Sequence, residues 1–219
     1  MDPYDQVIFL LKVVINVAPI AIYFLVLGLV NSQGHPKLVN ARSDFIALTL
    51  VFVPVLVWPV PLLVAGNYTW LLAAGLALGA AGFVALVPAP MSGWVIYNVG
   101  EGRCRRALEE AVEQAGWGFH WQDHTMTVPQ ANLRIDISCF PLLRNVSLHF
   151  RPIVGKLQAE PIELLRQHLE SRLMRVALLP STTGACLLVI GAGLLIVPLW
   201  MMSRHIDAIV ELVHRLLFA

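Results

Sequence analysis

The sequence predicts an α-helical membrane protein with four transmembrane helices and a small α+β domain inserted between the third and the fourth. Composition is the first observation: of 219 residues, 58% are hydrophobic and 13% are charged, against roughly 45–50% and about 25% in soluble proteins. The second observation is a set of four long apolar runs. The third is that charged residues are frequent in just one long segment, from about residue 97 to residue 180. An integral membrane protein with one aqueous domain accounts for all three.

The four apolar runs are long enough to cross a bilayer, since about 20 helical residues span a hydrocarbon core of roughly 30 Å. They cover residues 7–30, 45–65, 70–87 and 183–201. The connection between the second and third runs is short, so these two are expected to form an antiparallel hairpin. The first run follows Asp2 and Asp5 with no basic residue before it. A secretory signal would begin with basic residues, so this run is expected to remain as a span.

A polar face runs along the first predicted span, where Lys12, Asn16 and Tyr23 recur at helical spacing. One interpretation is a lining for a cavity or a substrate path, because ionisable groups inside a membrane often mark such sites. We favour the other interpretation. Lys12 lies little more than one turn inside, so its ammonium can reach the interface along its own aliphatic chain. Asn16 and Tyr23 would then hydrogen-bond to neighbouring helices.

Three prolines, Pro54, Pro59 and Pro61, interrupt the second predicted span. Each removes an amide donor from the helical hydrogen-bond ladder. The prolines are candidates for a hinge in a transport cycle, although a static kink held by packing is the more common outcome.

Small residues gather in the third predicted span, with Gly75 and Gly79 forming a GxxxG pattern. Such residues allow two helix backbones to approach closely. We favour packing inside one bundle over a homo-oligomer interface at this face. Beyond this span, Trp94 and Tyr97 are either interfacial anchors on an exit segment or part of a first strand of the domain, and periodicity does not separate the two.

Residues 98–180 have the alternating patterns of a small α+β domain. An amphipathic helix is expected over residues 101–115 and a second over 161–178, with Gly116 and Pro161 at suitable ends. Between them, alternation predicts three short strands at residues 119–122, 133–139 and 146–151, and residues 125–128 are a candidate for a fourth. Each strand alternates apolar and polar side chains, as antiparallel strands with one wet face do. The order predicts one sheet covered on one side by two helices.

The distribution of basic residues predicts how the chain is threaded. Lys37, Arg42 and the ten basic residues between Arg103 and Arg175 fall on one side, whereas Arg204 and Arg215 fall on the other. The positive-inside rule then places the domain in the cytoplasm and both termini outside, in what we expect to be a bacterial inner (plasma) membrane. Residues 204–218 form a charged amphipathic segment that is expected to lie along the membrane surface after the last span.

Motifs of catalysis and cofactor binding are missing from the sequence. It contains no GxSxG, HExxH, Walker or GxGxxG pattern, so neither an enzyme nor a cofactor is expected. The four predicted spans also lack Asp and Glu, which argues against proton-coupled transport. Cys104, Cys139 and Cys186 are scattered and are interpreted as buried free thiols.

One weak metal candidate lies on the polar face of the predicted sheet, where His120, His124, Asp136 and His149 would point outward. If their strands were neighbours, imidazoles and a carboxylate could gather around a metal. Asp123-His124 also has the composition of a hairpin turn, however, which would point His124 elsewhere. Solvated or hydrogen-bonded histidines are the alternative that we favour.

Two functional hypotheses follow. The first is a non-catalytic adaptor, assembly or sensor subunit that presents residues 98–180 to a protein partner. The alternative is a transporter or channel component that uses the polar face of the first span and the proline-rich second span. The net charge of +1 gives no indication of nucleic-acid binding.

Overall fold

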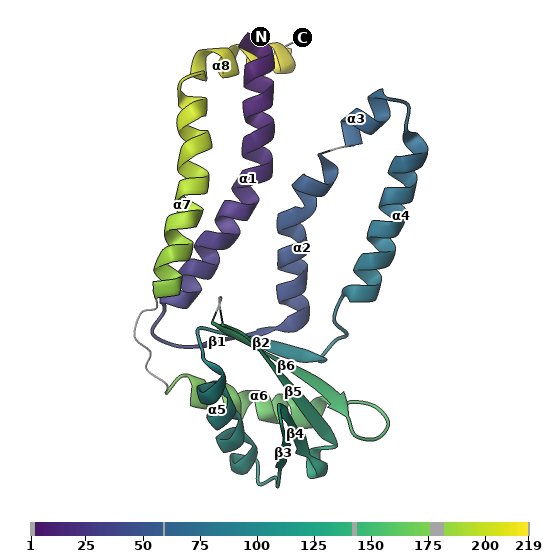
Figure 1. Ribbon diagram of the computed structural model, residues 1–219, viewed down its shortest axis with the longest axis vertical. Helices are drawn as coiled ribbons and strands as arrows, with labels where there is room; N and C mark the ends of the chain where they lie inside the picture. Colours follow the sequence, from purple (N-terminus) through teal and green to yellow (C-terminus); the bar gives the residue numbers. More distant parts are fainter. Residues whose placement is uncertain (1–2, 59, 142–143, 176–181, 219) are drawn as a thin grey trace. The chain divides into compact units, whose positions relative to one another are not determined.

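A computed structural model describes residues 3–58, 60–141, 144–175 and 182–218. The chain divides into two compact units. The first, the helical unit, consists of Met1–Leu27, Leu48–Ala80 and Cys186–Ala219, and the second, the α+β unit, consists of Gly28–Ala47 and Ala81–Ala185. Figure 1 labels the helices and strands that follow.

The apolar helices are α1 (Pro3–Ser32), α2 (Ala41–Val57), α3 (Val60–Ala65), α4 (Thr69–Leu86) and α7 (Thr182–Ser203). Among the described residues, three helices are long and apolar enough to cross a membrane, namely α1 from Gln6 onward, α4 and α7. The prediction of a fourth such helix over residues 45–65 is not met. That segment is divided between α2, with 17 residues, and α3, with six. The physical reason is local, because Pro59 and Pro61 cannot donate the amide hydrogen bonds that a continuous helix requires.

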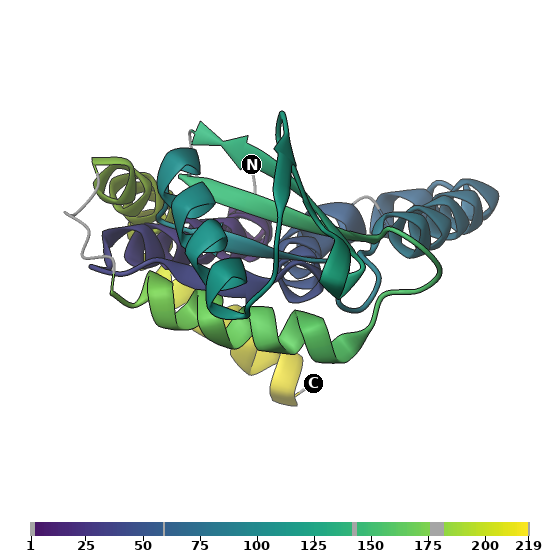
Figure 2. The same cartoon turned by 90° about the horizontal axis from the view of Figure 1, so that it is seen from below.

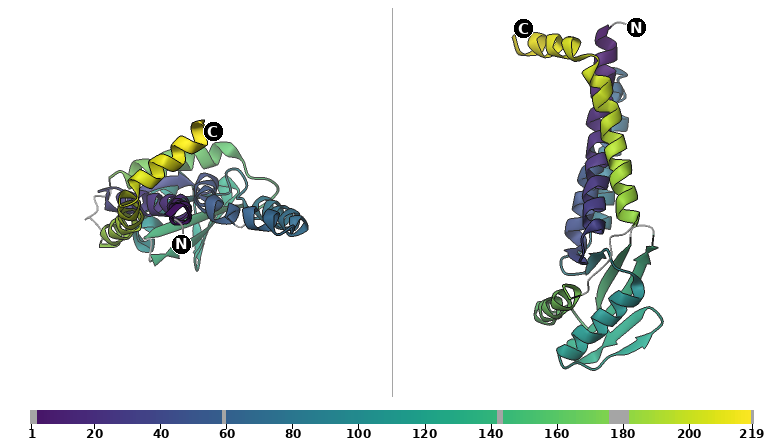
Figure 3. Two further views of the ribbon diagram at one scale, coloured as in Figure 1. Left: turned by 90° about the horizontal axis from the view of Figure 1, so that it is seen from above. Right: turned by 90° about the vertical axis from the view of Figure 1, so that its left-hand side faces the viewer.

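Within the helical unit, α1 and α7 lie side by side (Figure 1 and Figure 3). The contact is close at Gly191, where an added Cβ would lie 2.9 Å from the carbonyl oxygen of Ala21. The last helix, α8 (Ile206–Phe218), has the predicted bounds within two residues. It runs across the end of α7 (Figure 3).

The α+β unit is built on a six-stranded antiparallel sheet. Its strands are β1 (Lys37–Asn40), β2 (Gly93–Tyr97), β3 (His120–Gln122), β4 (Thr125–Val128), β5 (Leu133–Phe140) and β6 (Asn145–Pro152). They are arranged in the order β1-β2-β6-β5-β4-β3. A single 3₁₀ turn, η1 (Pro129–Ala131), separates β4 from β5. The three strands that the alternation predicts and the candidate fourth at residues 125–128 are therefore confirmed, as is the turn at Asp123-His124 between β3 and β4.

Two helices, α5 (Glu101–Gln114) and α6 (Ala159–Leu173), cover one face of this sheet (Figure 2). They bury a shared core with the inward residues of the strands, such as Ile135 and Leu148, against helix residues such as Leu108 and Leu169. The predicted sandwich is thus confirmed. The second helix ends at Leu173, earlier than the predicted 178, and residues 176–178 lie outside the described residues.

The sheet also contains two strands that lie outside the predicted range 98–180. Residues 37–40, between α1 and α2, pair with β2 as an edge strand. The exit segment around Trp94 is a central strand rather than an interfacial anchor, and Trp94 is 4% exposed. Its ring packs edge-on against Phe150, with centroids 4.5 Å apart. These strands depend on partners far away in the sequence, which local periodicity does not reveal.

Candidate functional site

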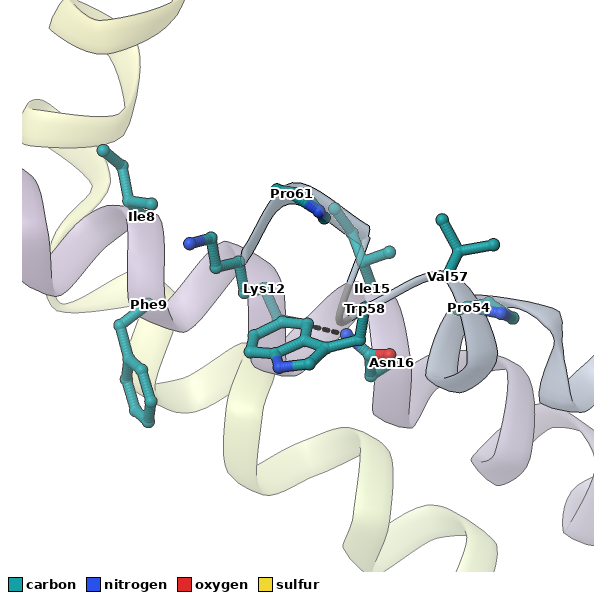
Figure 4. Close-up of a pocket in the computed structure, with 9 residues that line it drawn as sticks. All are labelled: Ile8, Phe9, Lys12, Ile15, Asn16, Pro54, Val57, Trp58 and Pro61. Carbon is teal, nitrogen blue, oxygen red and sulfur yellow. Dashed lines mark hydrogen bonds between the residues drawn. The ribbon is translucent and has the colours of Figure 1, made fainter. Parts of the chain in front are cut away.

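A cavity that carries a charged side chain lies in the helical unit, between α1 and the segment in which α2 ends and α3 begins (Figure 4). We call it the Lys12 pocket. Its volume is about 460 Å³, and it is lined by Ile8, Phe9, Lys12, Ile15, Asn16, Pro54, Val57, Trp58 and Pro61. Binding sites for small ligands typically have volumes of roughly 300–1,000 Å³ and mostly apolar walls with a few polar groups. The Lys12 pocket has both properties.

Helical spacing explains how α1 forms one wall of the pocket. Ile8, Lys12 and Ile15 follow one another at intervals of four and three residues, so their side chains leave the helix on the same face. The other wall depends on the prolines. The amide of Trp58 still donates to the carbonyl of Pro54, over 3.0 Å. α2 ends at Val57, and α3 begins at Val60 and contributes Pro61 to the same cavity.

The polar groups of the pocket are few and incompletely paired. The ammonium of Lys12 lies 5.7 Å from the centre of the Trp58 ring, a distance at which a cation is attracted to the aromatic face. The side-chain amide of Asn16 donates to the carbonyl of Lys12 over 2.8 Å. Its Oδ1 is buried and has no hydrogen-bond partner within the described part of the chain. Among the described side chains, no carboxylate forms an ion pair with Lys12.

The pocket contains some of the residues singled out from the sequence and omits others. Lys12 and Asn16 come together with Pro54 and Pro61, which belonged to a separate prediction. Pro59 lies outside the described residues. Tyr23 does not line the pocket, and its ring instead contacts that of Phe24, with centroids 6.4 Å apart. Trp58 was missed, because an aromatic residue next to a proline in an apolar run carries no distinguishing pattern.

The glycines of α4 line a second cavity, of about 510 Å³, between α4 and the α2–α3 segment. A Cβ added at Gly75 or at Gly79 would meet no atom within 4 Å. The close packing inside one bundle that we favoured from the GxxxG pattern is therefore not found among the described residues.

The candidate metal ligands are dispersed over the α+β unit. Asp136 and His149 are opposite each other on β5 and β6. His120 lies on the edge strand β3, opposite Thr127, three strands away from β6. Beyond the hairpin turn, the Nδ1 of His124 lies 3.0 Å from a carboxylate oxygen of Glu101. Within the described ranges, no three His, Cys, Asp or Glu residues are close enough to hold a metal ion.

The Asp136 carboxylate already has two partners of its own. The hydroxyl of Thr125 donates to its Oδ1 over 2.8 Å, and the guanidinium of Arg151 lies 3.3 Å from its Oδ2. These contacts support the alternative that we favoured from the sequence, in which the polar residues of this sheet face are solvated or hydrogen-bonded to one another.

The buried thiol of Cys104 is unsuited to nucleophilic chemistry. Burial under α5, with smaller effects of Cys139 and Glu101, raises its pKa to about 12. A thiol attacks as its thiolate, so a group with this pKa remains inert near neutral pH.

Two hydrogen bonds join β2 to segments that lead into the apolar helices, all within the α+β unit. The phenol of Tyr97 donates to Oδ1 of Asp44, at the start of α2, over 2.6 Å. The side-chain amide of Asn98 donates to the carbonyl of Gln33, just after α1, over 2.6 Å. Asn98 is fully buried, so this bond is screened from water. The C-terminal end of β2, at Tyr97 and Asn98, is thus hydrogen-bonded to both segments.

Comparison of the chain with protein-family models, with curated proteins and with solved structures found no match.

Proposed function

We propose that the protein is a non-catalytic, multi-pass membrane subunit that presents its α+β domain to a protein partner, as an adaptor, assembly factor or sensor. The main support for this proposal is that two strands of the domain come from the segments that connect the apolar helices. Its sheet takes β1 from the link between α1 and α2, and β2 from the segment that follows α4. The domain is therefore part of the connections between the apolar helices.

The ends of four apolar helices share a compact unit with the sheet. Residues 28–32 of α1, 41–47 of α2, 81–86 of α4 and 182–185 of α7 all belong to the α+β unit. The Tyr97–Asp44 and Asn98–Gln33 hydrogen bonds support the same connection. A partner that moves the sheet would act on these helix ends directly, because packed elements shift together. This arrangement suits a sensor or a coupling subunit.

The same division of the chain supports four membrane passages. We propose that α2 and α3 cross together, as a helix broken at its prolines, since broken helices occur in membranes where neighbouring protein satisfies the freed backbone groups. With α1, α4 and α7 this makes four spans in a bacterial inner membrane. The basic residues of the α+β unit favour a cytoplasmic domain with both termini outside.

The partner surface that we propose is the polar sheet face, which consists of the outward side chains of β3 to β6. These are His120, Gln122, Thr125, Thr127, Arg134, Asp136, Ser138, Ser147, His149 and Arg151. The opposite face is buried by α5 and α6. Exposed residues of this surface include Arg134, His149 and Arg151. A protein with an acidic surface would complement these cationic and imidazole groups.

Site-specific photo-crosslinking in native membranes tests this proposal. A photoreactive amino acid replaces His149, on the polar sheet face, and in a matched control it replaces Gln167, on the exposed side of α6. We expect a reproducible protein adduct from position 149 and none from position 167. The same adduct from both positions, or from neither in a correctly inserted protein, would contradict the assignment of this surface.

A second candidate function, a transporter or channel component, is favoured by the Lys12 pocket alone. Solute flux into proteoliposomes that contain the purified protein tests it. Under this alternative, Lys12→Ala abolishes flux while the fold is retained. Under the adaptor proposal, the same variant leaves partner crosslinking unchanged.

A further inference from the structure

We propose that the Lys12 pocket binds the headgroup of one anionic phospholipid, with its phosphate at Lys12 and its acyl chains along the apolar wall. This inference stands on the helical unit alone and does not depend on the partner of the α+β domain. Charge favours an anionic ligand. Lys12 is the one Lys or Arg between residues 1 and 36, and among the described side chains it has no carboxylate partner.

A cation inside an apolar cavity is stabilised by an anion that enters with it. The walls at Ile8, Phe9 and Val57 offer no polar side chain, and the ammonium lies 5.7 Å from the centre of the Trp58 ring. A cation–aromatic contact of this kind is worth roughly 0.5–1 kcal/mol at exposed sites. A phosphate oxygen would form a charge-assisted hydrogen bond with the same ammonium, which is the stronger interaction.

The pocket also presents hydrogen-bond acceptors, which a simple anion would leave unpaired. Oδ1 of Asn16 is buried and has no partner among the described residues. The carbonyl of Val57 cannot receive the usual helical bond from position 61, because Pro61 has no amide hydrogen. A ligand that fits these groups therefore carries a hydrogen-bond donor beside its negative charge.

These requirements select one class of membrane lipid. Phosphatidylglycerol has a phosphate together with hydroxyl donors. A fatty acid carboxylate has the charge but no donor, and phosphatidylcholine has a phosphate but neither net charge nor donor. The mostly apolar lining of the pocket suits the acyl chains, since Ile8 and Ile15 lie on one face of α1 and Phe9 adds an apolar ring beside them. Figure 4 shows Lys12 between Ile8 and Asn16 on this face, with Trp58 and Pro61 opposite.

Native mass spectrometry of the full-length protein in detergent tests the proposal by titration with three lipids: phosphatidylglycerol, oleic acid and phosphatidylcholine. We expect one phosphatidylglycerol to bind at least about tenfold more tightly than either of the others, which corresponds to a charge-assisted bond of about 1.4 kcal/mol or more. Equal affinity for phosphatidylglycerol and phosphatidylcholine would overturn the proposal.

The variants separate the pocket from general attraction between basic residues and anionic lipid. Lys12→Met should lower phosphatidylglycerol affinity about tenfold, and Lys12→Arg should retain most of it. The chain provides a matched control at Arg204, which lies over the Trp200 ring at 4.0 Å but does not line the Lys12 pocket. Arg204→Met should leave the affinity unchanged. Equal losses in Lys12→Met and Arg204→Met would assign the binding to surface electrostatics and reject the pocket.

Two further measurements make the result decisive. Asn16→Leu removes the unpaired acceptor and should weaken phosphatidylglycerol binding more than oleic acid binding, because only the former has a donor for Oδ1. Soluble glycerol 3-phosphate should not displace the bound lipid, since it lacks the acyl chains. Displacement by this compound at comparable concentration would overturn the lipid assignment and identify the pocket as a site for a soluble phosphate.

Discussion

At the scale of single residues, Gly93 makes the central strand pairing possible. Gly93 is the first residue of β2 and lies opposite His149 of β6. A Cβ added at this position would lie 2.2 Å from the carbonyl oxygen of Leu148, which is backbone and cannot rotate away. The absence of a side chain at residue 93 is therefore a condition for β2 and β6 to pair.

The first prediction follows from this contact. Gly93→Ala should lower the free energy of unfolding by about 1–3 kcal/mol, the usual effect of overpacking, as measured by denaturant unfolding of the full-length protein in detergent. Gly102→Ala is the control. Gly102 is exposed within α5, an added Cβ there would meet nothing within 4 Å, and alanine is the better helix former by roughly 0.5–1 kcal/mol. Opposite signs are expected, and equal effects of the two variants would contradict the explanation.

At the scale of secondary-structure elements, the break between α2 and α3 determines both the number of long helices and the shape of the Lys12 pocket. In a helix, the carbonyls of Val55 and Val57 accept from positions 59 and 61. Both positions are proline. Two of the hydrogen bonds that a continuous helix would form here are thus missing, and α2 ends at Val57 whereas α3 begins at Val60.

The second prediction is that Pro59→Ala combined with Pro61→Ala joins α2 and α3 into one helix, because both carbonyls regain donors. Amide hydrogen exchange of Val60–Ala65 should slow by at least about tenfold, since an interior proline destabilises a helix by roughly 3 kcal/mol. The control is Pro198→Ala in α7, a helix that is already continuous through its proline. It should leave exchange in α3 unchanged. Unaltered exchange in the double variant would show that packing, not the prolines, maintains the break.

The sequence predicted some helices and strands of the structure and missed others. The helices α5 and α6 and the four strands β3 to β6 have strong alternation or helical periodicity, and their bounds were predicted to within a few residues, apart from the end of α6. β1 has only four residues, in a segment that contains Gly34 and Pro36. Its strand conformation depends on pairing with β2, so no local pattern marked it. The Lys12 pocket was foreseen in part, because Lys12 and Asn16 share a helix face, whereas Trp58 joins them only through the bend after α2.

At the scale of the whole molecule, the adaptor proposal and the phospholipid proposal both place the apolar helices in a membrane. The third prediction uses single cysteines introduced at Tyr68, in the link between α3 and α4, and at Lys156, in the link between β6 and α6. Both positions are exposed. With a membrane-impermeant maleimide on intact cells, Tyr68→Cys should be labelled at once, and Lys156→Cys only after permeabilisation. The parent protein measures background labelling of the native cysteines, among which Cys104 is buried.

The reverse labelling pattern would contradict a cytoplasmic domain and would place the polar sheet face on the outer side. Labelling of both positions in intact cells would contradict a single membrane passage by α4 between residue 68 and residue 156. Neither result would affect the lipid titration, which is made with purified protein.

The sequence by itself determined where helices long and apolar enough to cross a membrane form, with the exception of residues 45–65, because apolar runs depend only on composition along the chain. It also determined most elements of the α+β domain, whose periodicity is local. The tertiary structure decided what depends on distant pairing: the two additional strands, the dispersal of the candidate metal ligands over separate strands, and the pocket around Lys12. These features require residues far apart in the sequence to meet, and the free energy of those contacts comes from packing and hydrogen bonding that no single segment contains.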